Sequence, residues 1–236
     1  MACWKKRVDG ETHVLEAGPV ARMWINAVSK KVPESTGNSV RFTLPAGAVA
    51  GYRVPGEVTM EWKIPKTINV LERIRARAYF HALSACMAYK QFLQAVDLVN
   101  KGQTKVWNKY KRPKNGMGVG MTEAMRGALG HWVVMRNGKI SRYQIITPTA
   151  WNVSPRDHLD RPGPYEQAII DTPITEPFNN GKLDGIDVVR TIRSFDPCLA
   201  CTVQVFRPDG EKMAVQEMEH LHVDQICHKH EKAHEH

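Results

Sequence analysis

The sequence predicts a mainly α-helical fold that carries one long amphipathic helix and one small β-hairpin. Between Lys66 and Gly102, apolar residues recur at steps of three and four, which is the pattern of a long amphipathic helix. The same period predicts shorter helices within Val14–Val28 and Ile186–Cys198. The hairpin is predicted from an Asn137-Gly138 turn between two runs of apolar, β-favouring residues.

The ends of these elements are marked by residues that favour turns. Gly18-Pro19 interrupts the chain before the first helix, and Gly102 gives the long helix a stop. The two hairpin strands are expected at His131–Met135 and Ile140–Thr147. A further short helix is expected to begin near Pro164, because proline is favoured in the first turn.

Composition indicates an ordinary globular protein with a basic surface. The chain has 236 residues, 24% of them charged, and a net charge of +9. The positive residues are spread along the chain, and no nucleic-acid module accompanies the denser patch at Lys105–Gly116, so we expect no nucleic-acid partner. No apolar stretch approaches the ~20 residues of a membrane helix, and the N-terminus has no apolar signal core.

Cys198 and Cys201 form a C-x-x-C pair behind Asp196-Pro197, which is expected to end the preceding helix. The pair could be half of a zinc ribbon that is completed by Cys227 and nearby histidines. It could be a thioredoxin-type redox pair, but such a pair opens a helix, whereas this one follows a helix. It could also be part of a soft-metal site, since thiolates suit nickel and iron.

Other cysteines and histidines are expected to be structural. The chain has five cysteines and no secretory signal, which argues against a disulfide framework. Cys86 and His81 lie on the long predicted helix, and a cysteine on an apolar helix face usually behaves as a small hydrophobic residue. We therefore assign neither residue as a metal ligand.

The C-x-x-C pair is accompanied by other motifs. In chain order they read "LEAGPVARM", "EAMRGALGHW", "YQIITPTAWNVSPRD", "GPYEQA" and "RSFDPCLAC". Together they resemble the C-terminal part of the large subunit of nickel–iron hydrogenases, over roughly Leu15 to Gln204. The related respiratory Complex I subunit is a weaker match, because it has lost the metal cysteines. The resemblance implies a multi-helical large-subunit fold with the hairpin near the metal site.

The resemblance also implies roles for individual residues. Cys198 would be a terminal nickel ligand, and Cys201 would bridge nickel to an iron that carries cyanide and carbon monoxide. Arg126 would lie over the metals and take part in splitting dihydrogen, and Asp196 would hold that arginine in place. Pro148 and Thr149 would form the segment that hydrogen-bonds an iron cyanide.

Three departures separate this chain from the family pattern. The N-terminal R-x-C-G-x-C motif of the family is absent, and with it half of the thiolates and a proton-relay glutamate. Gln204 stands where the family has His or Arg, at the residue that becomes the mature C-terminus and can bind magnesium; its carbonyl oxygen could serve a hard cation. Met125 stands where the family usually has proline before Arg126.

These observations predict two segments. Residues 1–204 would be the C-terminal portion of a hydrogenase large subunit, which acts in the reversible oxidation of dihydrogen. Residues 205–236 would be a histidine-rich extension that is removed on maturation; it could collect nickel, although its composition favours a plain solvated tail. The alternative is a truncated or divergent homologue that binds nickel or zinc without catalysis.

The resemblance implies several partners. They are an iron–sulfur small subunit, the missing N-terminal half of the large subunit, a maturation protease and nickel-insertion proteins. Because the chain carries no targeting or membrane signal of its own, we expect it to be cytoplasmic or membrane-associated through the small subunit.

Overall fold

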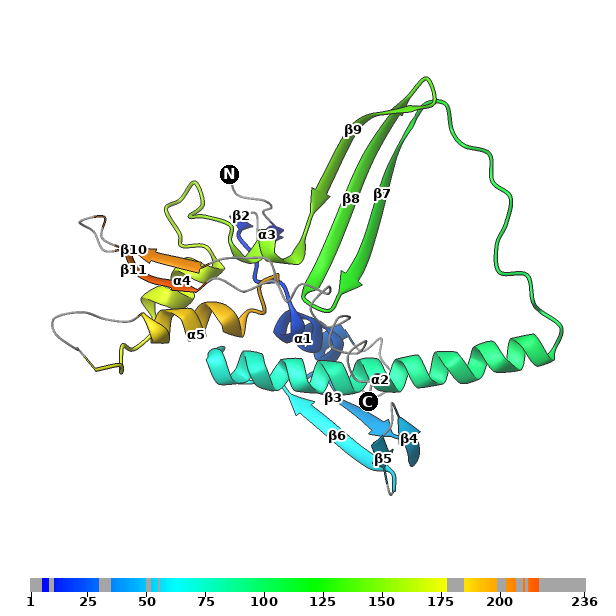
Figure 1. Ribbon diagram of the computed structural model, residues 1–236, viewed down its shortest axis with the longest axis horizontal. Coiled ribbons are helices and arrows are strands. Elements are labelled where there is room, and N and C mark those ends of the chain that lie inside the picture. Colours follow the sequence, from blue (N-terminus) through cyan, green and yellow to red (C-terminus); the bar gives the residue numbers. More distant parts are fainter. Residues whose placement is uncertain are drawn as a thin grey trace, which may run out of the picture.

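The protein combines helices with many short antiparallel strands (Figure 1). A computed structural model describes residues 6–8, 11–29, 35–49, 52–54, 56–177, 185–198, 203–206, 210 and 212–216. Within these ranges the chain forms five helices and eleven strands, and the strands belong to five separate sheets. The prediction of a mainly α-helical fold with a single small hairpin is therefore wrong.

The helices, in chain order, are α1 (Pro19–Ser29), α2 (Val70–Asn100), α3 (Pro148–Asn152), α4 (Pro164–Ile170) and α5 (Ile186–Ser194). The strands, in chain order, are β1 (Lys6–Val8), β2 (Glu11–His13), β3 (Ser39–Leu44), β4 (Gly47–Val49), β5 (Tyr52–Val54), β6 (Val58–Lys63), β7 (Gly116–Ala124), β8 (Gly127–Arg136), β9 (Lys139–Ile146), β10 (Val203–Phe206) and β11 (Lys212–Gln216). The strands pair as β1–β2, β3–β6, β4–β5, β7–β8–β9 and β10–β11.

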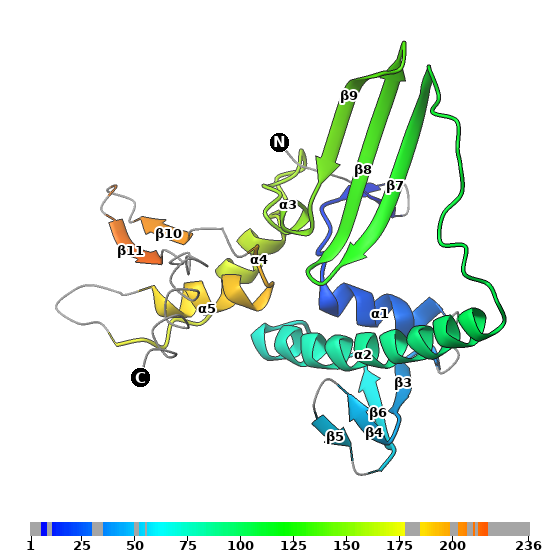
Figure 2. The same cartoon turned by 45° about the vertical axis from the view of Figure 1, so that its right-hand side comes forward.

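The hydrophobic core lies where α1 and the first half of α2 pack against β3 and β6 (Figure 2). Met23, Val40, Trp62 and Ala76 are fully buried there. Burying a large apolar side chain contributes about 1.5–3 kcal/mol, so these positions fix how the two helices cross the strand pair. Cys86 is also buried in this core, as expected for a structural cysteine.

The long helix α2 confirms the predicted amphipathic segment and adds a feature that the sequence pattern did not indicate. It begins with Asn69 as its cap, because the Asn69 side chain accepts a hydrogen bond from the Glu72 N–H at 3.0 Å. Its buried positions end at Cys86, and the following residues are exposed except for the half-buried Tyr89. His81 is exposed, and among the described residues it belongs to no group of side chains that could hold a metal ion. The second half of α2 therefore projects from the core (Figure 1).

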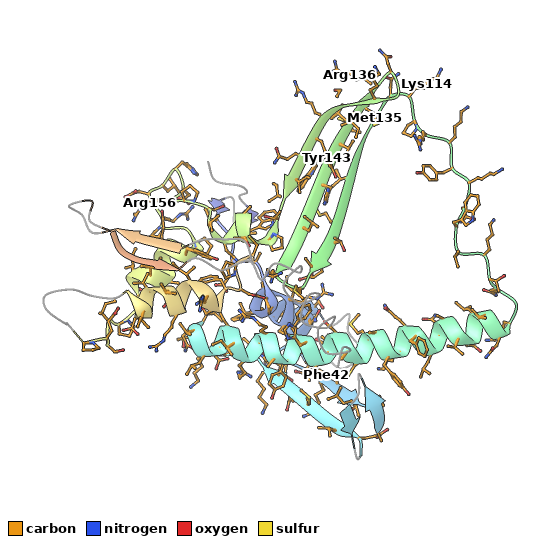
Figure 3. All side chains as sticks on the ribbon, in the orientation of Figure 1. Phe42, Lys114, Met135, Arg136, Tyr143 and Arg156 are labelled. Carbon is orange, nitrogen blue, oxygen red and sulfur yellow. The ribbon has the colours of Figure 1, made fainter. Side chains whose placement is uncertain are left out.

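The predicted hairpin is present as β8 and β9, but it is part of a larger sheet. Asn137 and Gly138 form its turn with φ angles of 50° and 75°, as an N-G turn requires. A third strand, β7, pairs along the whole of β8, so the result is a three-stranded antiparallel sheet. Figure 3 shows Lys114 and Arg136 together at its tip, where the Gly138 N–H donates to the Lys114 carbonyl at 2.8 Å.

The strands that contradict the helical prediction have a common physical cause. β3 and β6 are separated by a stretch with several glycines and prolines, and β7 has glycine at every second position from Gly116 to Gly120. Glycine and proline weaken the strand signal of a single sequence, but in the fold each of these strands gains a full-length partner. Cross-strand pairing therefore outweighs their low intrinsic preference.

The short helix predicted near Pro164 is present as α4. Pro164 occupies the first turn of α4, and the Glu166 side chain accepts a hydrogen bond from the Gly163 N–H at 3.0 Å. None of the helices in the described ranges is both long and apolar enough to cross a membrane.

Candidate metal centre

The end of α5 forms a tight turn that carries Cys198. The helix ends at Ser194, and the Asp196 N–H still donates to the Arg193 carbonyl at 3.0 Å. Asp196 then adopts a left-handed φ of 59°, which costs an L-residue about 1–2 kcal/mol. This reversal, followed by Pro197, leads the chain to Cys198, which is exposed. The prediction that Asp196-Pro197 ends the helix is confirmed.

Asp196 lies between two guanidinium groups. Its Oδ1 is 3.6 Å from the Arg126 Nε, and its Oδ2 is 3.6 Å from the Arg77 Nε. Arg126 also donates from Nε to the Pro197 carbonyl at 3.3 Å, so it contacts the turn as well as the carboxylate. About a quarter of each of these three side chains is exposed. The cluster thus has one more positive than negative group and is partly shielded from water.

Thr149 connects the turn to α3. Its Oγ1 accepts a hydrogen bond from the Cys198 N–H at 3.2 Å. The preceding Pro148 is buried and occupies the first turn of α3, which holds the threonine at the start of that helix.

Two glycines bring Arg126 to this place. Arg126 lies in the β7–β8 turn, and Gly127 directly after it has a φ of 124°. A Cβ added at Gly127 would be 2.7 Å from the Gly18 nitrogen, and one added at Gly18 would be 3.4 Å from the Arg126 carbonyl oxygen. The two backbones therefore touch at a distance that only glycine allows. Met125, which replaces the family's proline, is 56% exposed beside this contact.

Asn152 fixes the same junction from α3. It is 1% exposed, and its amide both accepts from the Ala17 N–H at 2.8 Å and donates to the Ala17 carbonyl at 2.9 Å. The two hydrogen bonds hold the segment before α1 against α3. Trp151 adds a hydrogen bond from its indole N–H to the Ala128 carbonyl at 3.0 Å. The three elements that carry Arg126, Thr149 and Gly18 are thus cross-linked by polar contacts.

Aromatic and charged side chains pack against Phe195, the residue directly before Asp196 in the turn. Phe195 packs against Tyr165 with the two rings tilted and 4.6 Å between their centroids, and the guanidinium of Arg73 lies 3.8 Å from the Phe195 centroid. Arg73 in turn donates two hydrogen bonds to Glu16, at 2.8 and 2.9 Å. Burial, assisted by the nearby Asp196 charge, raises the pKa of Tyr165 to about 12. Phe195 therefore rests on a rigid base directly before Asp196.

A second charged pair lies at the other side of the junction. Arg22 on α1 donates to Glu123 on β7 at 2.9 Å, and a cavity of about 190 Å³ opens beside them. Burial raises the pKa of the Glu123 carboxyl above its usual value, although Arg22 opposes the shift. A larger cavity of about 590 Å³ lies between the start of α2 and α4, and it is lined by none of the predicted site residues.

The structure brings together most of the predicted site residues. Arg126, Asp196, Cys198 and Thr149 meet at the α5 turn, although they come from three distant parts of the chain. Cys201 lies outside the described residues. Gln204 lies in β10, where its backbone pairs with Val215. Within the described part of the chain, no group of three or more His, Cys, Asp or Glu side chains could hold a metal.

Sequence reasoning missed Arg77 and the Gly18–Gly127 contact. Arg77 was not distinguishable, because arginines also occupy positions 73 and 75 of the same helix. The glycines were visible inside two motifs, but nothing in the sequence indicated that the motifs touch.

Comparisons with known proteins agree with this arrangement. The family described as nickel-dependent hydrogenase matches residues 3–204. The chain is 34% identical to the uptake hydrogenase large subunit of Azotobacter chroococcum mcd 1 and to the hydrogenase-2 large chain of Escherichia coli K12. The first comparison covers 89% of this chain and 34% of the relative, and the second covers 89% and 35%.

A solved structure gives the same result. The actinobacterial-type NiFe-hydrogenase from Ralstonia eutropha H16 aligns with a TM-score of 0.75 and 42% identity, over 83% of this chain and 35% of that chain. The chain thus spans about a third of the length of these relatives. With the family matched over residues 3–204, which include the elements that surround the α5 turn, the chain belongs to the nickel-dependent hydrogenase family.

Proposed function

We propose that the chain supplies the C-terminal portion of a nickel–iron hydrogenase large subunit. The reaction is the reversible conversion of dihydrogen into two protons and two electrons. The observation that carries the proposal is the α5 turn, where the exposed Cys198 donates its N–H to Thr149. On the same turn Arg126 pairs with Asp196 and donates to the Pro197 carbonyl directly before Cys198. Membership of the family gives this cluster its chemical setting.

The donor set of the turn fits one part of a nickel–iron centre. Cys198, with Cys201, would supply two thiolates, which are the soft ligands that nickel and iron accept. The centre, with cyanide and carbon monoxide on its iron, would supply the site where dihydrogen is bound and its electrons are accepted. The remaining ligands must come from outside the described residues, because these contain no complete cluster.

The protein's own residues would orient and stabilise this site. The Arg126 guanidinium is charged at every physiological pH. Its Nε is committed to the Pro197 carbonyl, so its two terminal nitrogens are left to donate toward a small anionic ligand beside Cys198. Asp196 would hold the guanidinium in this orientation and balance part of its charge. Pro148 and Thr149 would position the neighbouring donor to an iron cyanide.

The remaining roles follow from the same proposal. Residues 1–204 would form the large-subunit portion, and residues 205–236 would be an extension removed after nickel insertion by a maturation protease. Gln204 would then be the mature C-terminus and could offer its side-chain oxygen to magnesium. The partners would be an iron–sulfur small subunit, which carries electrons, and a segment that supplies the two missing thiolates.

The experiment starts with the protein isolated without oxygen from its own cells grown with nickel. Intact mass comes first: a mass well above 26.7 kDa, toward that of relatives whose length this chain covers by only about a third, would place the missing cysteines upstream in the same chain. Nickel and iron content, infrared bands of diatomic ligands and hydrogen-dependent dye reduction would then support the hydrogenase, and Cys198→Ser should abolish all of these signals. One zinc per chain without such bands would favour a non-catalytic metal-binding homologue instead.

A further inference from the structure

Arg77 contacts both the carboxylate that pairs with Arg126 and the helix end that leads to it. Its Nε lies 3.6 Å from the Asp196 Oδ2, and its Nη2 donates to the Ser194 carbonyl at 2.8 Å and to the Arg193 carbonyl at 3.4 Å. Arg77 belongs to α2 and lies more than a hundred residues before the end of α5 in the sequence. The contacts therefore join two elements of the tertiary structure.

The contacts of Arg77 with the end of α5 stabilise that helix end. The last carbonyls of a helix have no partner within the helix, and a cation at this end is stabilised by the helix dipole. Arg77 satisfies two of these carbonyls directly before the chain turns at Asp196. The backbone of Arg77 is itself fixed, because the adjacent Ala76 is fully buried in the core. The end of α5 is thereby held to the buried part of α2.

The contact with Asp196 determines which carboxylate oxygen faces Arg126. Arg77 lies on the Oδ2 side and Arg126 on the Oδ1 side, so a single carboxylate is held between two fixed cations. The Arg77 Nε is buried and has no hydrogen-bond partner, which leaves Asp196 as the group that balances it. Without Arg77, the Asp196 side chain could rotate toward water. Arg126 would then lose the ion pair that orients its guanidinium group.

We propose that Arg77 is a positioning residue for Arg126, and that it acts through Asp196. The inference rests on the proposed function, because Arg126 is placed at the metal site there. It goes beyond that function by assigning a role to a residue that touches neither the cysteine turn's sulfur nor the predicted ligands. Supporting residues one contact away from a metal site commonly change activity by about 10- to 100-fold.

The test uses the assembled enzyme and a double-mutant cycle. Arg77→Gln should lower hydrogen-dependent dye reduction by about 10- to 100-fold while nickel and iron content stay at the wild-type level. Asp196→Asn should cause a similar loss. If Arg77 acts through Asp196, the double variant should lose no more than Asp196→Asn alone, and Arg77→Lys should recover part of the activity because it keeps the charge.

Arg75→Gln is the matched control. Arg75 lies on the same helix and also contacts one carboxylate and one carbonyl, those of Glu72 and Lys63, but it is remote from the turn. It should leave turnover unchanged. The proposal is overturned if Arg77→Gln behaves like this control, if its loss adds fully to that of Asp196→Asn, or if the loss is explained by missing nickel.

A second readout does not depend on turnover. The Cys198 N–H is hydrogen-bonded to Thr149, so its amide exchange reports the geometry of the turn. Arg77→Gln should accelerate this exchange, and the control should not. If the wild-type protein shows no hydrogen oxidation, the proposed function fails, whereas unchanged exchange at Cys198 in Arg77→Gln would overturn the positioning role by itself.

Discussion

Gly127→Ala should disturb the placement of Arg126 more directly than any other single-methyl change. Gly127 has a φ of 124°, and a Cβ there would lie 2.7 Å from the nitrogen and 2.9 Å from the Cα of Gly18. Both neighbours are backbone atoms and cannot rotate away. Backbone strain of about 1–3 kcal/mol and overpacking of about 1–3 kcal/mol together predict a loss of about 2–6 kcal/mol in the free energy of unfolding.

Gly138→Ala is the control that separates these two contributions. Gly138 has a φ of 75°, but a Cβ there would meet no atom within 4 Å. Only the cost of a left-handed residue remains, which is about 1–2 kcal/mol. Any larger loss in Gly127→Ala therefore measures the contact between the two glycine segments.

The assay is urea unfolding of both variants, followed by circular dichroism and analysed by linear extrapolation. Hydrogen-dependent dye reduction of the assembled enzyme is measured beside it. We expect Gly127→Ala to lose activity as well as stability, because Arg126 directly precedes the displaced residue. The reasoning is refuted if Gly127→Ala unfolds within about 0.5 kcal/mol of Gly138→Ala, the usual scatter of neutral substitutions.

Three further changes test other contacts of the site. Asn152→Ala leaves the N–H and carbonyl of Ala17 without partners and should cost about 2–4 kcal/mol; a loss below that in urea unfolding would mean that water replaces the amide. Thr149→Val removes the acceptor of the Cys198 N–H and should accelerate its amide exchange, whereas Thr149→Ser should not. Burial raises the pKa of the Glu123 carboxyl, so its protonated form favours folding. That contribution is complete below the unfolded pKa and is lost as pH rises through the folded pKa. Glu123→Gln should therefore gain stability over wild type as pH rises from acid to neutral, and a urea midpoint difference independent of pH would contradict this.

Local signals in the sequence predicted those elements that local physics determines. The amphipathic period places α2 within a few residues of the predicted segment, and the Asn137-Gly138 turn forms as expected. β7 was missed because its alternating glycines give no β-propensity, and it exists through its pairing with β8. Such tertiary compensation has no local signature.

At the site, too, local signals predicted the local features but not the contacts between distant parts of the chain. That Asp196-Pro197 ends a helix follows from the proline, but that Arg126 meets Asp196 does not, since the two lie in different elements far apart in the chain. The resemblance to a known family provided that pairing as an expectation. Arg77 was beyond both approaches, because neither its spacing nor the quoted motifs distinguish it from its neighbours on α2.

The two halves of α2 have different surroundings, and this bears on how the site keeps its shape. Arg77 lies in the half whose neighbours Ala76 and Leu83 are buried, whereas beyond Cys86 residues such as Phe92 are 64% exposed. A helical stretch of this length without packing is only marginally stable in water. Fraying there should stop at the buried turns, because each of them is fixed by the core. The contacts from Arg77 to α5 and Asp196 start on the packed side of that boundary, so the geometry of the cysteine turn does not depend on what covers the exposed half of the helix.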